Sequence, residues 1–314
     1  DEMKVSKKKL RLKYVFPKKI SMKNLLVLLL VIASFLFGIL VDKTIFLRSE
    51  TNSVNVAADN SKDLANIQNQ VLKEKYVFKI KWEDLGEKMV GDGVIDKTKL
   101  AQAITGTDEL SEDLEKYFSG NQNQIELTSE NSNFWVDVLW GLGLANKNKV
   151  LETGEMIAEG DTNDFASTGG WSLGTGDPMN HYSGHYYINL SDKQQELVEE
   201  IAGNIYRPCC GNSTMFPDCN HGMAALGLIE LMASQDFSKD EIYKTVLAFN
   251  INWFPETYLN TAYYLKQNDR DYEKISAKEI LSKTFSSSMG SESIQKKVGN
   301  IEWFGSEGGG SCEA

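Results

Sequence analysis

Residues 204–235 read NIYRPCCGNSTMFPDCNHGMAALGLIELMASQ, a loop with three cysteines that leads into an apolar helix. Asn220 stands where it can cap this helix, because an asparagine side chain accepts hydrogen bonds from the free N–H groups of a first turn. Pro255 marks another helix start. Capping pairs mark three more, at Ser191 and Gln194, Ser238 and Glu241, and Ser276 and Glu279. Residues 185–285 are therefore predicted to be mainly helices joined by short loops, and the predicted fold class is mainly α.

The region before these helices is less uniform. Residues 133–148, NFWVDVLWGLGLANKN, carry apolar side chains at helical spacing and predict a buried core helix. Residues 76–82 alternate between apolar and other side chains, which favours one short isolated strand. Residues 154–184 are rich in Gly, Asp, Ser and Thr. A long loop of this kind is more often a functional segment or a boundary than a simple connector.

The composition is that of a globular chain with an unusual start. The 314 residues are 41% hydrophobic and 25% charged, enough to bury a core in one or two domains. The net charge is −11, yet nine of the 33 Lys and Arg residues lie within residues 1–23. The rest of the chain is therefore strongly acidic, which argues against binding of nucleic acid or anionic lipid by the main body.

An apolar run follows the basic arm directly. Residues 25–41, LLVLLLVIASFLFGILV, contain no charge and are long enough, with their flanks, to cross a bilayer. The cations before the run place the N-terminus in the cytoplasm and the main domain outside, as a single-pass protein of the cell membrane. The run is longer than the apolar region of a cleaved signal peptide, and no small-residue cleavage site follows closely. We therefore predict a retained signal anchor.

These observations give a predicted domain organisation. The segments are a basic cytoplasmic arm (1–23), a transmembrane anchor (24–41), a stalk (42–75), an extracytoplasmic, mainly helical domain with long Gly-rich loops (76–304) and a flexible Gly-rich tail containing Cys312 (305–314). A subdomain boundary is expected near 156–184.

The cysteines and histidines are concentrated in one part of the chain. All three histidines and three of the four cysteines lie within residues 181–221. Thiolate and imidazole groups are preferred ligands of soft and borderline transition metals, and four such groups in 13 residues can close a tetrahedral site. The predicted metal ligands are Cys209, Cys210, Cys219 and His221. Zinc, iron and copper are not distinguished, and the paired Cys209 and Cys210 differ from the usual Cys-x-x-Cys spacing.

Two other interpretations of the cysteines stay open. Outside the cytoplasm Cys219 can form a disulfide with Cys209 or Cys210, which would make the domain a stapled envelope scaffold that binds a protein or polymer partner. Alternatively, the cysteines are the redox-active thiols of a thiol–disulfide oxidoreductase, with Cys312 on a mobile tail. Cys219 precedes a helix N-terminus, which is expected to lower its thiol pKa. Oligomeric state and catalytic residues are not assigned.

His181 and His185 lie four positions apart in HYSGHYY, within a Gly-flanked loop. Because helical geometry is not expected in such a loop, we predict ordinary stacked or exposed histidines there rather than metal ligands.

Residues 204–235, with the core pattern YRPCC…FPDCNHGMA, resemble the signature of an uncharacterised family of membrane-anchored proteins from reduced-genome bacterial lineages. Supporting segments are residues 93–100 (GVIDKTKL), 139–156 (LWGLGLANKNKVLETGEM), 169–174 (GGWSLG) and 308–312 (GGGSC). The family has no known activity. The resemblance therefore implies only that Cys209, Cys210, Cys219 and His221 occupy signature positions and that Cys312 matches a cysteine near the end.

Overall fold

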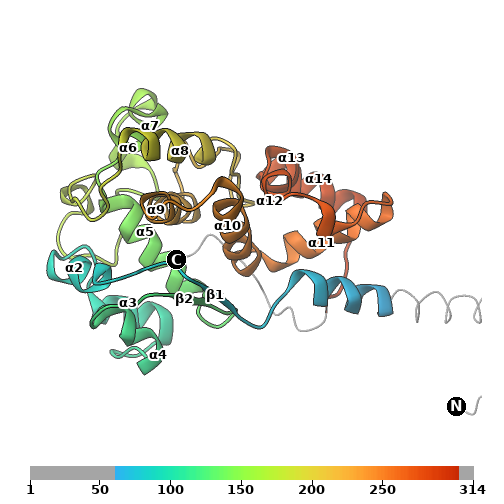
Figure 1. The fold of residues 1–314 in the computed structure, drawn as a ribbon, viewed down its shortest axis with the longest axis horizontal. Helices are drawn as coiled ribbons and strands as arrows, with labels where there is room; N and C mark the ends of the chain where they lie inside the picture. The colour runs from blue at the N-terminus through green and yellow to red at the C-terminus, as the bar shows by residue number, and fades with distance from the viewer. Residues whose placement is uncertain (1–60, 304–314) are drawn as a thin grey trace, which may run out of the picture. The chain divides into compact units, whose positions relative to one another are not determined.

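The computed structural model describes residues 61–303, and this part of the chain is mainly helical, as the sequence predicts (Figure 1). The predicted anchor at 24–41 and the tail with Cys312 lie outside the described residues. Within residues 61–303 no helix has the length and apolar character that a membrane crossing requires.

The elements follow one another in a long series of helices. The longer helices are α3 (Lys97–Thr105), α5 (Ser132–Ala145), α8 (Asp192–Ala202), α9 (Asn220–Ser234), α10 (Lys239–Trp253), α11 (Pro255–Gln267) and α14 (Ser288–Val298). The shorter helices are α2 (Leu85–Gly91), α4 (Glu112–Glu115), α6 (Lys149–Thr153), α7 (Glu155–Glu159), α12 (Ala277–Ile280) and α13 (Lys283–Ser286). Single 3₁₀ turns are η1 (Lys116–Phe118), η2 (Thr162–Asp164), η3 (Pro178–Asn180) and η4 (Tyr272–Lys274).

The core is built around α5 and α9, which lie side by side to the left of α10 in Figure 1. Every residue of α9 except Ser234 is buried, and α5 is buried except at Asn133. A helix that is apolar on all sides must be surrounded, because no face of it can meet water without cost. Helix α9 accordingly packs against α5, α8 and α10.

Two glycines let α5 and α9 approach closely. A Cβ atom on Gly227 would lie 2.6 Å from the carbonyl oxygen of Leu139, and one on Gly143 would overlap the carbonyl oxygen of Met223. Backbone atoms cannot move aside as a flexible side chain can, so any larger residue would push the helices apart.

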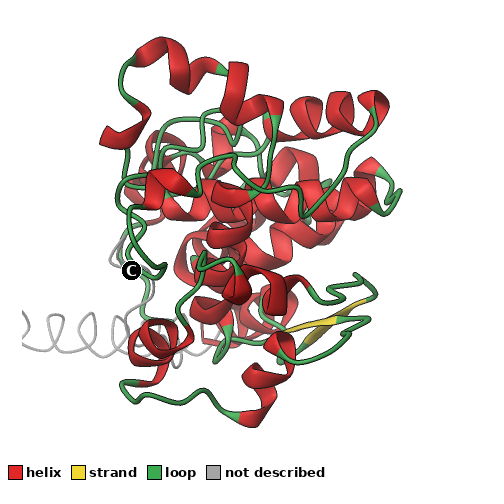
Figure 2. Cartoon of the chain, turned by 90° about the vertical axis from the view of Figure 1, so that its left-hand side faces the viewer, coloured by secondary structure: helices red, strands yellow, loops and turns green. Residues whose placement is uncertain are grey.

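The only strands among the described residues form a small antiparallel pair at the edge of the helical body (Figure 2). Strand β1 (Tyr76–Phe78) pairs with β2 (Ile125–Leu127) in the register Tyr76 to Leu127. The expected strand near residues 76–82 is therefore present but shorter, and it is not isolated. Its partner β2 was not anticipated, since three residues are too few to show an alternating pattern.

The compact unit begins before Tyr76. Residues 61–71 are helical, and both Ile67 and Val71 are buried within the core cluster. From Lys62 onward the described residues form one compact unit. Part of the segment assigned to the stalk from sequence thus packs as part of the domain.

Candidate metal centre

The loop between α8 and α9 folds back on itself to bring its ends together. The backbone N–H of Thr214 donates to the oxygen of Ile205 at 2.9 Å, and Tyr206 forms a bridge with Ser213. The N–H of Cys210 donates to the oxygen of Arg207 at 3.3 Å, which closes a turn over the two adjacent cysteines. These contacts place Cys209 and Cys210 opposite the start of α9.

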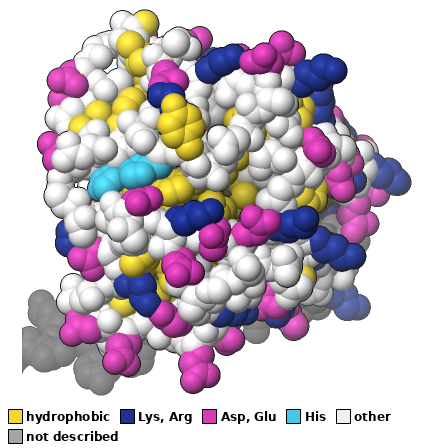
Figure 3. Space-filling model, turned by 60° about the vertical axis from the view of Figure 1, so that its left-hand side comes forward, with side chains coloured by type: hydrophobic (Ala, Val, Ile, Leu, Met, Phe, Trp, Pro, Cys, Tyr) yellow, Lys and Arg dark blue, Asp and Glu magenta, His cyan; other side chains and the backbone are white. Residues whose placement is uncertain are grey.

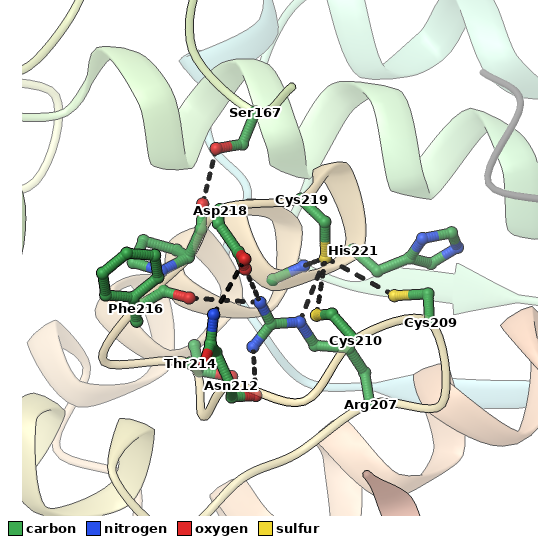
Figure 4. A network of polar contacts seen from close by, with 12 residues as sticks. Ser167, Arg207, Cys209, Cys210, Asn212, Thr214, Phe216, Asp218, Cys219 and His221 are labelled. Carbon is green, nitrogen blue, oxygen red and sulfur yellow. Dashed lines mark hydrogen bonds and ion pairs between the residues drawn. The ribbon is translucent and has the colours of Figure 1, made fainter. Parts of the chain in front are cut away.

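Arg207 holds the inside of this loop (Figure 4). Its side chain is 1% exposed, and its guanidinium donates to Asp218 Oδ1 at 2.7 Å and to Cys219 Sγ at 3.1 Å. It also donates to the carbonyl oxygens of Asn212 at 3.0 Å and Phe216 at 3.2 Å. A planar guanidinium with five donors can connect four such acceptors at once, which a lysine cannot do. Arg207 was not predicted as a site residue. The sequence does contain a signal for it, namely an arginine directly before Pro-Cys-Cys and an aspartate, Asp218, directly before the third cysteine.

The three cysteine sulfurs converge beside Arg207. Cys219 Sγ lies 3.4 Å from Cys209 Sγ and 3.3 Å from Cys210 Sγ, and all three sulfurs lie within 4.8 Å of one another. The three are free thiols, because a disulfide would need about 2.05 Å between sulfurs. Sulfurs bound to one tetrahedral zinc at about 2.3 Å stand roughly 3.8 Å apart, so the observed spacing is close to that of a shared ion. This group could hold a metal, and the disulfide alternative is not seen among these three residues.

The thiols differ in acidity. Hydrogen bonds from Cys209 and Cys210, together with the positive charge of Arg207, lower the pKa of Cys219 well below its usual value. Hydrogen bonding to its two neighbours and burial raise the pKa of Cys209. For Cys210 the contact with Cys209 acts in the opposite direction, but the hydrogen bond to Cys219 and burial prevail and raise its pKa to about 12. Cys219 is thus the most acidic of the three thiols.

Cys219 is also the N-cap of α9. Its sulfur accepts a hydrogen bond from the N–H of Gly222 at 3.4 Å, while Asn220 is the first residue of the helix. The expectation that Asn220 caps this helix is therefore wrong by one residue. The helix N-terminus and Arg207 both present positive charge to the same sulfur, which is the local environment of an anionic thiolate.

His221 lies apart from the sulfur group. Its nitrogens are not among the ligand atoms that lie within 4.8 Å of one another, and Nδ1 is 2.9 Å from Asn220 Oδ1. The ring is buried against Trp253 and Phe254, with centroids 5.5 and 4.5 Å away. Burial lowers the pKa of His221 to about 4, so the imidazole is neutral at pH 7. The structure thus brings together three of the four predicted ligands, and ligation by His221 stays a prediction.

The Gly-rich segment packs on the cysteine loop. Ser167 is fully buried and its hydroxyl donates to the oxygen of Pro217 at 2.5 Å, while its N–H donates to the oxygen of Asp218 at 3.3 Å. The rings of Phe165 and Phe216 meet edge to face at 5.4 Å. Residues 154–184 therefore support the loop that carries the cysteines.

A surface hollow of about 420 Å³ is lined in part by Cys209. Its polar lining includes Glu256, Asn260 and Glu292 from α11 and α14. Of the three converging cysteines, Cys209 alone lines this hollow.

His181 and His185 lie together at the end of the Gly-rich segment, with His181 inside it and His185 directly after it. The Nδ1 of His181 is 3.2 Å from the Nε2 of His185. Burial lowers the pKa of His185, partly offset by the nearby carboxylate of Asp92. The two rings stack at a centroid distance of 5.5 Å, as the predicted stacked histidines would.

No protein-family model matches this chain, and no curated protein or solved structure shows significant similarity to it.

Proposed function

We propose that the chain binds one soft or borderline transition-metal ion through the thiolates of Cys209, Cys210 and Cys219. The convergence of these three sulfurs within 4.8 Å carries the proposal. Such sulfur donors favour zinc, copper(I) or iron over magnesium or calcium.

The charges around the sulfurs favour a divalent over a monovalent ion. Three thiolates and a divalent cation carry a net charge of −1, and the guanidinium of Arg207, 3.1 Å from Cys219 Sγ, offsets only part of it because it also pairs with Asp218 Oδ1 at 2.7 Å. A monovalent ion would leave one more buried negative charge without a partner, which is costly. Three protein ligands leave one tetrahedral position for water, for a ligand from the hollow beside Cys209, or for His221 after a movement of its ring.

The test is the metal content of the full chain, purified in reductant without chelator and measured by native mass spectrometry. We expect one ion per chain at the three thiolates, lost on acidification, and one ion fewer after Cys219→Ser. Cys312→Ser is the matched control and should keep the ion, because Cys312 is not one of the three converging thiols. A reduced wild-type chain without an ion, or equal metal content in both variants, would refute the proposal.

His221→Gln tests the fourth ligand in the same measurement. An unchanged ion content with unchanged affinity means that three thiolates and a non-protein ligand suffice. A loss of affinity similar to that caused by Cys219→Ser would make His221 a ligand, as the sequence predicts.

A second candidate function is thiol–disulfide exchange, favoured by the lowered pKa of the Cys219 thiol and by the two further thiols within 3.4 Å of its sulfur. Cys219 would attack an external disulfide, form a mixed disulfide and release one thiolate. Cys210 would then lose its proton and attack Cys219 Sγ, which releases the second thiol and leaves a Cys210–Cys219 disulfide. Incubation with glutathione disulfide separates the two functions: the exchange enzyme loses the mass of two hydrogens, whereas a metal-loaded site resists oxidation.

The proposal also places this domain outside the cell, held by residues 24–41. It is supported by the uncharged run and by the excess of Lys and Arg before it. Protease added to intact cells should digest the domain and leave the basic arm protected. Digestion of the arm alone would reverse the orientation.

A further inference from the structure

His181 and His185 are held in a tight turn rather than in a helix. The N–H of Gly184 donates to the oxygen of His181 at 2.9 Å, and Ser183 takes a positive φ of 48° to close the turn. The turn brings the two rings side by side with His181 Nδ1 and His185 Nε2 facing each other at 3.2 Å.

The outer nitrogen of each ring faces an oxygen acceptor. His181 Nε2 is 3.3 Å from the carbonyl oxygen of Thr175, and a carbonyl can only accept, so Nε2 carries the hydrogen. His185 Nδ1 lies 3.5 Å from the carboxylate of Asp92, which favours a hydrogen on that nitrogen. Tyr187 fixes this carboxylate by donating its hydroxyl to Asp92 Oδ2 at 2.9 Å, and its ring stacks on His185.

This arrangement leaves two lone pairs that face each other. A neutral imidazole carries one N–H, so hydrogens on the two outer nitrogens leave His181 Nδ1 and His185 Nε2 unprotonated. Two such lone pairs 3.2 Å apart repel unless a cation lies between them. Nitrogens bound to one ion at about 2.0–2.1 Å stand roughly 3.3 Å apart in tetrahedral geometry, which matches the observed spacing.

The surroundings are those of a histidine metal site. Metal-binding histidines usually donate their other N–H to a carboxylate or a backbone carbonyl, and here Asp92 and Thr175 supply one of each. The backbone is also fixed, since His185 donates to the oxygen of Ala145 at 2.9 Å and accepts from Lys147 at 2.7 Å. The side chain of His185 keeps 22% exposure, and histidine side chains reach the surface on the face drawn in Figure 3.

We propose that His181 Nδ1 and His185 Nε2 form a second metal site, which binds a divalent transition-metal ion of the zinc class with water completing its coordination. The only group of three or more ligating side chains among residues 61–303 is the cysteine group, so this site has two protein ligands and exchanges its ion more readily. It is independent of the three-thiolate site in residues and in ligand chemistry.

Zinc binding to the full chain tests the site, with Cys219→Ser as the background so that the thiolate site does not contribute. Native mass spectrometry and calorimetric titration with ZnCl₂ should show one ion per chain. His181→Gln/His185→Gln should abolish it, and the neighbouring exposed Tyr186→Phe should retain it as the matched control. Equal binding by the double variant and the control would overturn the proposal. Zinc binding at the histidines without metal at the cysteines would support this proposal and refute the proposed function. Metal at the cysteines without zinc at the histidines would do the opposite.

The imidazole ¹⁵N spectrum gives a direct second test, because the chain has only three histidines. Zinc should shift His181 Nδ1 and His185 Nε2 while both outer nitrogens keep their hydrogens. A shared N–H···N proton that persists at saturating zinc would show that a proton, not a metal, joins the rings, and would refute the site. Asp92→Asn should weaken zinc binding by about 10–100-fold, since Asp92 is a positioning residue that acts through His185.

Discussion

Replacing Arg207 by methionine should remove the main support of the cysteine loop. The substitution keeps the length of the side chain but removes hydrogen bonds to Asp218, Cys219 and the carbonyl oxygens of Asn212 and Phe216. Hydrogen bonds to charged groups contribute about 1.5–3 kcal/mol each, and neutral ones about 1 kcal/mol. Part of this is regained, because the Asp218 side chain is 23% exposed and can be solvated. We therefore expect a loss of about 3–5 kcal/mol in the free energy of unfolding, which is the range observed when one partner of a buried ion pair is removed.

Urea unfolding of the full chain, followed by far-UV circular dichroism, measures this loss. Reductant and chelator should be present, so that neither disulfides nor bound metal adds to the difference. Arg207→Lys keeps the charge but not the planar donors, and should lose about half as much. Lys239→Met is the surface control: its partner Glu200 is 48% exposed, and such pairs contribute about 0–1 kcal/mol. If the free energy of unfolding of Arg207→Met is within 1 kcal/mol of that of the control, at an unchanged m-value, the guanidinium does not hold the loop and the reasoning fails.

Three further predictions concern the rest of the domain. Gly227→Ala should destabilise it by about 1–3 kcal/mol in the same assay, because the new methyl meets the carbonyl of Leu139, whereas Gly91→Ala, with open space around it, should be neutral or slightly stabilising. Ser238→Ala should cost about 0.5–2 kcal/mol by removing the cap of α10, and a loss as small as that of an exposed serine elsewhere would contradict the capping role. Burial raises the pKa of Asp137 from 3.8 to about 7, so the folded chain keeps a proton that the unfolded chain releases and stability falls as pH rises through this window. Relative to Asp137→Asn, the wild type should therefore lose about 2–3 kcal/mol between pH 5 and pH 8, and a constant difference would disprove the buried carboxyl.

Helix starts were predictable because their signals are local. The capping boxes at Ser191 and Ser238 form as the sequence indicates, with both reciprocal hydrogen bonds present. Pro255 begins α11, and the apolar run at 133–148 becomes the buried helix α5. In each case the deciding contacts join residues within one or two turns, and the sequence contains them directly.

The site was predictable only in part, because some of its contacts join residues far apart in the sequence and others depend on an unusual backbone conformation. Cysteine chemistry and spacing identified the three sulfurs that converge. Spacing cannot show that the ring of His221 turns to Trp253 and Phe254, since those side chains come from the end of α10 and the residue after it. The same is true of His181 and His185, whose facing nitrogens depend on a turn with a positive φ at Ser183.

Ser167 gives the Gly-rich segment a mechanical property that its composition hides. All its polar groups form hydrogen bonds. The hydroxyl donates to the oxygen of Pro217, the N–H donates to the oxygen of Asp218, and the carbonyl accepts from Trp140 Nε1 at 2.7 Å. Through these hydrogen bonds Ser167 joins the Gly-rich segment to both the cysteine loop and α5. The segment should therefore resist limited proteolysis and hydrogen exchange around Ser167, and it is a poor place to insert a tag or to cut the chain. Engineering of this domain would better begin at exposed turns such as that around Gly120, which has open space beside it, provided that Gly120 itself is kept, since its φ is 76°.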